Sequence, residues 1–150
     1  MVGGASDLYG NLERAKGKEL KHKRLWKNMA KSNDECIFCK IVKGEVKAEI
    51  VKTGNSFIAI KDISPVAQGH LLVIPKQHYG TLLDIPNNLA EELLKFIKEV
   101  SSEMLEKKLG DGFNIIMNNL EPAGQFVMHA HIHVIPRKEN DGIRFLTRDK

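Results

Sequence analysis

The chain has 150 residues, of which 42% are hydrophobic and 28% charged, and its formal net charge is +4. These values predict one globular domain with a core of its own and an ordinary soluble composition. No apolar run approaches the roughly 20 residues that span a bilayer, and the N-terminal residues lack the apolar core of a signal peptide. We therefore expect a cytoplasmic protein without membrane contacts.

The positive charge is concentrated near the N-terminus. Residues 1–33 hold 8 basic and 3 acidic side chains, a balance of +5, whereas the remaining residues hold 15 basic and 16 acidic side chains, a balance of −1. We interpret residues 1–34 as a basic leader, flexible or partly helical. A short basic arm can attract phosphate-bearing polymers, but a solvated tail is the simpler interpretation. We expect no binding of nucleic acid beyond weak contacts from this leader.

The first half of the body combines a short helix with three strands. Asp34 is a suitable N-cap for a helix over residues 36–42. Three apolar runs bounded by turn residues follow as strands, at residues 48–53, 56–61 and 70–74. Gly54 and Asn55 predict a tight hairpin between the first two strands, and Pro75 ends the third.

The second half contains one long helix and two strands. Asn87 or Asn88 caps the helix, whose apolar residues recur at intervals of three and four and so share one face. Two further strands, at residues 113–118 and 127–136, are separated by a loop with Gly and Pro. Strands that meet in hairpins, with one long helix between strand groups, predict an α+β fold with an antiparallel sheet of about five strands.

The last predicted strand carries the strongest chemical signal. Side chains alternate faces along a strand, so His129, His131 and His133 share one face. With six histidines in 150 residues, a chance His-x-His-x-His is on the order of a one-in-a-hundred event, which makes three unrelated surface histidines a weak interpretation. Three imidazoles could hold a catalytic zinc with an open fourth position. Alternatively, one imidazole is a nucleophile that its neighbours orient beside an anionic substrate.

The loop before these histidines favours the nucleophile. Gly124 permits close approach of the backbone, and Gln125 offers an amide donor, and both features suit a phosphate better than a metal. Asn118, at the end of the preceding strand, could add a second neutral donor.

At this point the sequence resembles the histidine triad family of nucleotide hydrolases and transferases. Residues 124–137 match the family signature, in which three histidines alternate with apolar residues. Two upstream blocks, residues 62–78 and residues 36–45, also match in order and spacing, and the latter is typical of prokaryotic members. The resemblance implies a HIT-like fold with a catalytic domain over residues 35–140, a C-terminal tail over residues 141–150, and a homodimer.

The resemblance also implies catalytic roles. His131 is the nucleophile that attacks an α-phosphate and forms a nucleotidyl-histidine intermediate, while the backbone carbonyl of His129 holds its Nδ1 proton. His133 hydrogen-bonds the phosphate and assists the leaving group. His70 matches a fourth histidine beside the triad.

Other positions match the family's substrate contacts. Gly124, Gln125 and Asn118 lie at the phosphate, and Asp62 binds the ribose hydroxyls, a bidentate contact that suits a diol. The positions that match the nucleobase pocket are Ile37, Phe38, Ile41 and Ile60. Phe126 is a departure, because the family usually carries Ser or Thr there, with a hydroxyl on the leaving-group side.

The two cysteines, spaced C-x-x-C, are too few for a disulfide scaffold and leave metal binding and redox chemistry open. The βαβ context of a thioredoxin-like motif is missing, and tetrahedral zinc needs two further ligands. By the resemblance these ligands are His78 and His129, which implies one structural Zn²⁺ held with Cys36 and Cys39. The alternative is two reduced cysteines without a metal.

The sequence therefore favours a hydrolase or nucleotidyl transferase that acts on the α-phosphate of a purine nucleotide conjugate, either a dinucleoside polyphosphate or a nucleoside phosphoramidate. One alternative is a nucleotide-binding interaction module with incidental hydrolysis. The other is a zinc hydrolase that uses the three triad histidines as ligands.

Overall fold

The computed structural model describes residues 34–145. The predicted basic leader, apart from Asp34, and the last residues of the predicted tail lie outside the described residues. Within this part of the chain, five strands form one antiparallel sheet in the order β1-β2-β3-β5-β4, which confirms the predicted α+β fold. The strands are β1 (Ile50–Thr53), β2 (Phe57–Lys61), β3 (Leu71–Pro75), β4 (Gly112–Ile116) and β5 (Ile132–Arg137).

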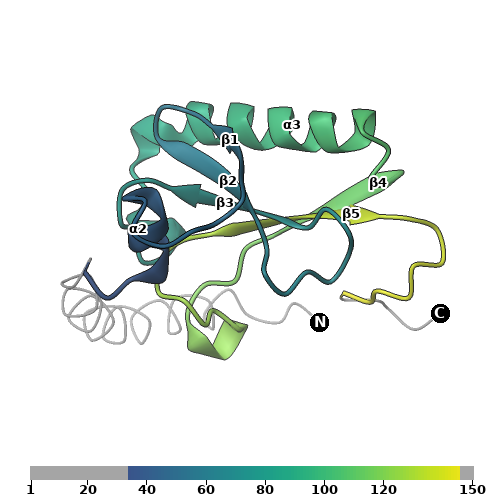
Figure 1. Ribbon diagram of the computed structural model, residues 1–150. Helices are drawn as coiled ribbons and strands as arrows, with labels where there is room; N and C mark the ends of the chain where they lie inside the picture. The colour runs from purple at the N-terminus through teal and green to yellow at the C-terminus, as the bar shows by residue number, and fades with distance from the viewer. Residues whose placement is uncertain (1–33, 146–150) are drawn as a thin grey trace, which may run out of the picture.

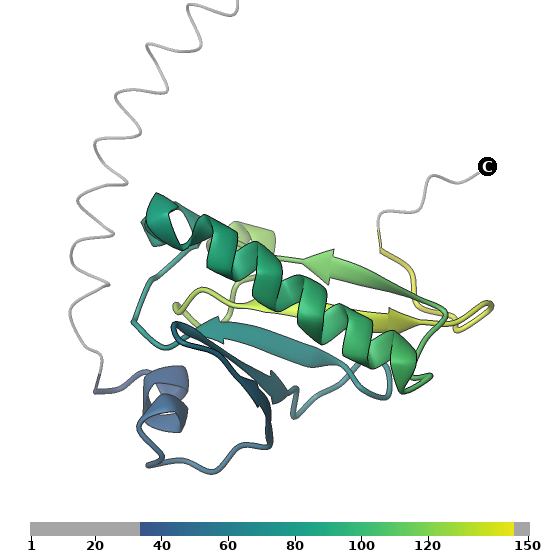
Figure 2. The same ribbon diagram turned by 90° about the horizontal axis from the view of Figure 1, so that it is seen from above.

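Two helices cover opposite faces of the sheet (Figures 1 and 2). The long helix α3 (Ala90–Glu106) buries Phe96, Val100 and Met104, which repeat every four residues and therefore lie on one face. They pack against one side of the sheet. The short helix α2 (Ile37–Val42) packs against the other side. Because both faces are covered, β3 is buried along its whole length and β2 is buried except at Lys61.

Several element boundaries differ from the prediction: β1 begins at Ile50 instead of residue 48, and β4 ends at Ile116 instead of residue 118. Residues 87–89 form a 3₁₀ turn, so α3 begins at Ala90 without a side-chain cap; the N–H of Leu89 bonds the carbonyl of Pro86 instead. Asp34 does not cap α2 but pairs with Lys43 at 3.3 Å. β5 begins only at Ile132.

The late start of β5 has a local cause. The N–H of Ala130 donates to the carbonyl of Tyr79 at 2.6 Å, which diverts residues 127–131 from the sheet ladder. Only His133 of the triad is therefore a strand residue. All three histidines still lie on the α2 side of the sheet, because His133 pairs with Leu72 of that layer and the other two rings contact Phe38.

Two long connections reach this side of the sheet from opposite ends. Residues 62–70 join β2 to β3 at the end where β3 starts, and residues 117–131 join β4 to β5 at the end where β3 finishes. Figure 1 shows both connections below the sheet, away from α3. Part of the predicted tail is also held in place, since Arg137 bonds both carboxylate oxygens of Asp141 and the carbonyl of Ile143. Among the described helices, none has the length and apolar content needed to cross a membrane.

Candidate active site and metal site

His131 has the geometry of an oriented nucleophile. Its Nδ1 lies 2.7 Å from the backbone carbonyl oxygen of His129. A carbonyl oxygen only accepts, so Nδ1 carries a proton, and in the neutral ring the lone pair is then on Nε2. The side chain is buried, and the edge of its ring contacts Phe38 with the centroids 5.2 Å apart. A neutral imidazole with a free Nε2 is nucleophilic near pH 7.

A chain of hydrogen bonds fixes the proton on His133. The N–H of Val66 donates to His70 Nδ1 at 3.2 Å, so the proton of His70 is on Nε2. That Nε2 lies 2.9 Å from His133 Nδ1, which must accept. His133 therefore carries its proton on Nε2 and offers an N–H donor to a substrate. Sequence reasoning missed Val66, because a backbone N–H leaves no signal in residue type.

Asp62 stands beside this chain. Its Oδ2 lies 3.4 Å from His70 Nε2 and 3.9 Å from His133 Nδ1. Burial lowers the pKa of His70 and lowers the pKa of His133 to about 4, against the opposing effect of Asp62. The neighbouring rings of His131 and His70 lower the pKa of His133 further. Both imidazoles are therefore neutral at pH 7, as the hydrogen-bond chain requires.

A second cluster joins α2 to the segment before β5. The ligand atoms of Cys36, Cys39, His78 and His129 all lie within 4.8 Å of one another. Nδ1 of His129 is 3.3 Å from Cys36 Sγ and 3.5 Å from Cys39 Sγ, and Nδ1 of His78 is 3.2 Å from Cys39 Sγ. Nε2 of His129 donates to the carbonyl of Pro75 at 2.8 Å, which leaves its Nδ1 lone pair turned to the cysteines.

These four residues fit a tetrahedral metal. Zinc bonds of about 2.3 Å to sulfur and about 2.0–2.1 Å to nitrogen place the two ligand types about 3.6 Å apart, close to the separations found here. Burial lowers the pKa of His78 and lowers that of His129 to about 4, so both are in the neutral form that binds metals. Burial raises the pKa of the Cys39 thiol to about 11, so a bound cation would have to displace its proton.

The other groups of candidate ligands fit a metal less well. Asp62, His70 and His133 also converge within 4.8 Å, but the proton on His70 Nε2 points into that cluster and would block a cation. Within residues 34–145 the three triad histidines do not gather as one ligand set, since His129 belongs to the cysteine cluster. This arrangement disfavours a zinc hydrolase built on the triad.

Gln125 holds the loop before the triad together. Its side chain is 2% exposed. Oε1 accepts from the N–H of Leu120 at 2.7 Å, and Nε2 donates to the carbonyls of Gly80 at 2.7 Å and Val127 at 3.0 Å. Both amide hydrogens are thus used within the protein, so the donor that we expected to face a phosphate is already engaged. Gln125 instead positions the loop.

The rest of this loop is shaped by two residues with positive φ. Leu120 has φ +71°, a costly value for a residue other than glycine, and its N–H donates to Gln125 Oε1. Gly124 has φ +88°, where glycine is favoured. Asn118 lies against it, with Nδ2 3.5 Å from the Gly124 carbonyl oxygen. Of the predicted phosphate contacts, Asn118 keeps an uncommitted side-chain oxygen, for which no partner is found within residues 34–145.

The predicted base-pocket residues separate into two groups. Phe38, Ile41 and Ile60 pack in the core layer under α2 and are at most 8% exposed. Ile37, at the start of α2, is 40% exposed. Ile63, which sequence reasoning did not single out, directly follows Asp62 and is 96% exposed. Ile63 therefore adds accessible apolar surface next to Asp62. In the sequence, only its position directly after Asp62 could have pointed to it.

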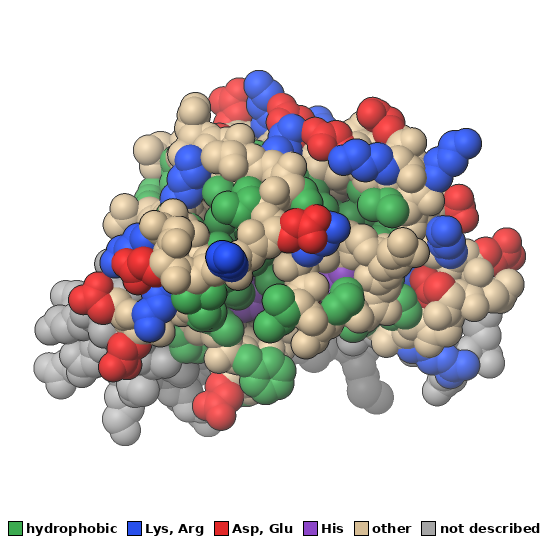
Figure 3. Space-filling model, in the orientation of Figure 1, with side chains coloured by type: hydrophobic (Ala, Val, Ile, Leu, Met, Phe, Trp, Pro, Cys, Tyr) green, Lys and Arg blue, Asp and Glu red, His purple; other side chains and the backbone are tan. Residues whose placement is uncertain are grey.

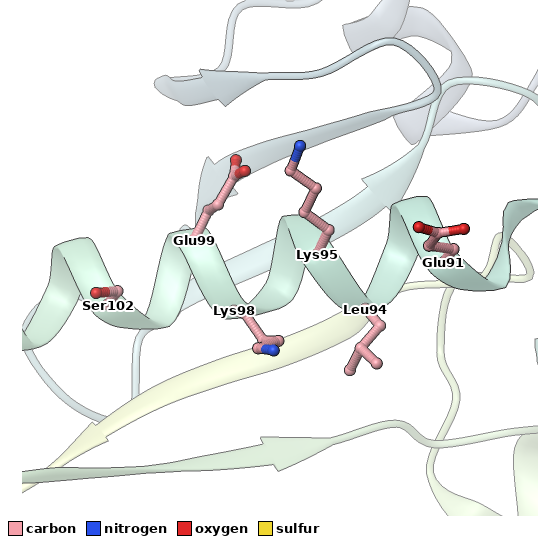
Figure 4. A pocket seen from close by; sticks show the side chains of 6 residues that line it. All are labelled: Glu91, Leu94, Lys95, Lys98, Glu99 and Ser102. Carbon is pink, nitrogen blue, oxygen red and sulfur yellow. The ribbon is translucent and has the colours of Figure 1, made fainter.

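The site lies on the other side of the sheet from the hollow beside α3. Figure 3 shows small patches of histidine atoms between apolar side chains near the middle of the visible face. The hollow drawn in Figure 4 is lined by Glu91, Leu94, Lys95, Lys98, Glu99 and Ser102 of α3. None of these described lining residues is a histidine or cysteine, and α3 covers the opposite face of the sheet.

The site therefore combines an oriented imidazole, a neutral imidazole donor and a separate cysteine–histidine cluster on an α+β sheet. A family model described as the HIT domain matches residues 43–140. The chain belongs to the HIT domain family.

Three relatives from other organisms are similar over most of the chain. An uncharacterized HIT-like protein of Methanocaldococcus jannaschii is 48% identical over 109 residues, which cover 71% of this chain and 82% of that protein. An adenosine 5'-monophosphoramidase of Candida albicans is 36% identical, with 72% and 74% covered. An adenylylsulfatase of Arabidopsis thaliana is 37% identical over 72% of this chain, which spans 55% of that longer protein.

A solved structure is similar as well. The crystal structure of a Zn-bound histidine triad family protein from Mycobacterium smegmatis superposes with a TM-score of 0.71 at 35% identity, covering 76% of this chain and 83% of that one.

Proposed function

We propose that the protein is a hydrolase or nucleotidyl transferase acting on the α-phosphate of a purine nucleotide conjugate, through a covalent nucleotidyl-histidine intermediate. The observation that carries the proposal is the bond of 2.7 Å between His131 Nδ1 and the His129 carbonyl, which leaves Nε2 free to attack phosphorus. The names of the phosphoramidase and adenylylsulfatase relatives support this reaction class.

The reaction proceeds in two displacements. First, a bond forms between His131 Nε2 and phosphorus, and the bond from phosphorus to the leaving atom breaks, with its electron pair going to the leaving group. The leaving nitrogen of a phosphoramidate also takes up a proton from solvent, so that it departs as the amine. The Nε2–H of His133 donates a hydrogen bond that stabilises the developing negative charge. Then the oxygen of water, or of another acceptor, attacks phosphorus; the electron pair of the P–N bond returns to Nε2, and the acceptor's proton passes to solvent. Splitting one displacement into two lowers each barrier.

The remaining polar groups bind the substrate. Asp62 accepts from the ribose hydroxyls, and Asn118 and the backbone at Gly124 contact the phosphate. Ile37 and Ile63 offer accessible apolar surface to the base, at the edge of the core residues under α2. Dinucleoside polyphosphates and nucleoside phosphoramidates both fit such a site.

The test is the substitution His131→Asn, assayed with an adenosine phosphoramidate and with diadenosine tetraphosphate. Loss of the nucleophile should reduce kcat at least about a thousandfold and leave nucleotide affinity within a few-fold. Unchanged turnover would refute the assignment. Tight nucleotide binding by the wild type, with negligible turnover of every substrate tried, would favour the interaction module instead.

We further propose one structural Zn²⁺ held by Cys36, Cys39, His78 and His129. The ligand separations support it, as does the Zn-bound relative from Mycobacterium smegmatis. With four protein ligands the ion would supply a cross-link and no open catalytic position. That cross-link would fix His129, whose carbonyl orients His131. The cysteines are both free, which agrees with a cytoplasmic, reducing location.

We also propose a homodimer formed across β4. Among the described residues β4 pairs only with β5, so its other edge can accept a strand. Phe113 and Ile115 are 41% and 43% exposed on the α3 side of this edge strand, and Leu94 of α3 is 60% exposed. A second copy would cover these apolar side chains.

A further inference from the structure

Phe126 is an exposed aromatic side chain on the loop that leads into the triad. It is 94% exposed, more than any other aromatic residue within the described range. An exposed Phe forgoes the stabilisation that burial would give. It also replaces the hydroxyl-bearing residue that the sequence resemblance predicts at this position, so the loop loses a polar group and gains a ring.

The backbone on both sides of Phe126 is held rigidly. The preceding Gln125 is buried and makes three hydrogen bonds to the backbone, one of them to the carbonyl of Val127. The side chain of Val127 packs against the apolar layer that includes Phe38. The ring of Phe126 is therefore presented from a fixed point, and binding to it costs little ordering of the loop.

Two more exposed apolar side chains lie on the connection that approaches the triad from the other end of the sheet. Ile63 is 96% exposed and follows Asp62, and Val66 is 50% exposed and donates its N–H to His70. We call Ile63, Val66 and Phe126 the apolar rim. Its members come from the connections at residues 62–70 and 117–131, which reach the α2 side of the sheet from opposite ends. The ring of His131 contacts that of Phe38 on the same side of the sheet.

The polar groups near Phe126 offer little to a small hydrophilic leaving group. Both amide hydrogens of Gln125 are engaged, and Phe126 has no hydroxyl. The Nε2–H of His133 is a donor for the leaving atom.

We propose that Phe126 is a specificity-determining residue that stacks on an aromatic leaving half of the nucleotide conjugate. The inference rests on the proposed function. It narrows the substrate class to nucleoside monophosphates joined to a group with a planar apolar part, in preference to ammonia or a short aliphatic amine. Offset stacking on one ring is worth roughly a 2- to 12-fold change in an equilibrium constant.

The experiment compares two substrates with the same adenylyl half and amines of similar basicity, the tryptamine and the propylamine phosphoramidates. Phe126→Ser should raise KM for the tryptamine conjugate roughly 2- to 12-fold and leave the propylamine conjugate within twofold. Val51→Ser, at a half-exposed apolar residue of β1, is the matched control and should change neither.

Each other outcome decides against the proposal. Equal effects of Phe126→Ser on both substrates would show that the ring only shapes the loop. A shift of the molar mass of that variant in light scattering would show that a second copy covers the ring. No turnover of either conjugate by the wild type, with binding retained, would overturn the proposed function itself and this inference with it.

Discussion

The anchoring role of Gln125 leads to a prediction that its sequence pattern alone would not make. Gln125→Ala removes three hydrogen bonds of 2.7–3.0 Å, to the backbones of Leu120, Gly80 and Val127. Each such bond contributes about 1 kcal/mol net, so the bonds together contribute about 3 kcal/mol. The loss of a 2% exposed side chain adds a cavity, while water restores part of the bonding. We expect the free energy of unfolding to fall by about 2–4 kcal/mol, a large part of the 5–15 kcal/mol typical of a domain.

The assay is urea unfolding of the wild type and two variants. Gln125→Ala should lower the midpoint with an unchanged slope. Gln68→Ala is the matched control, because Gln68 is exposed and makes no side-chain hydrogen bond within residues 34–145; its effect should stay within about 0.5 kcal/mol.

Measurements of turnover distinguish two roles for Gln125, positioning of the loop and donation to the substrate phosphate. If Gln125 positions the loop, Gln125→Ala loses stability and turnover together. If the amide instead donates to the substrate phosphate, turnover falls while the unfolding curve overlays that of the wild type. That second result would refute the positioning role.

Three further predictions concern pH, metal and assembly. Because burial and neighbouring rings hold the pKa of His133 near 4, the unfolded state takes up a proton between about pH 6.5 and 4 that the folded state does not. The free energy of unfolding should therefore fall as the pH drops through this window, and it should fall less in His133→Asn. Equal pH dependence in the two proteins would contradict this prediction. Metal analysis of wild type prepared without chelator should find one zinc per chain, and Cys39→Ser should carry almost none. Wild type without zinc would contradict the proposed metal site. Ile115→Lys should halve the mass seen by light scattering, and an unchanged mass would exclude β4 from the interface.

Local pattern was sufficient for most of the fold. The apolar runs of β2 and β3 predict strands because both faces of these strands are buried. The spacing of three and four in α3 predicts its buried face for the same physical reason. A predicted boundary was wrong where a backbone group bonds a residue far away in the sequence. The N–H of Ala130 bonds the carbonyl of Tyr79, and β5 therefore starts later than predicted.

The candidate site also has features that the sequence predicts and features that depend on the fold. Residue types and spacing pointed to the three histidines and the two cysteines, since few side chains can do that chemistry, whereas the resemblance singled out His131 as the nucleophile and Asp62 as a substrate contact. Two features depend on contacts between residues far apart in the sequence. Gln125 bonds Gly80, 45 positions away, and the proton on His133 is set through His70, 63 positions away. Such contacts follow from the assembled sheet and are not visible in a motif.

The proposed reaction requires that His131 Nε2 form a bond to phosphorus. Its most direct test is mass spectrometry of protein quenched during turnover of an adenosine phosphoramidate, under non-acidic conditions that preserve a P–N bond. We expect one adenylyl group on the peptide that contains His131, and none in His131→Asn. An adduct on another residue, or full turnover by His131→Asn, would contradict it.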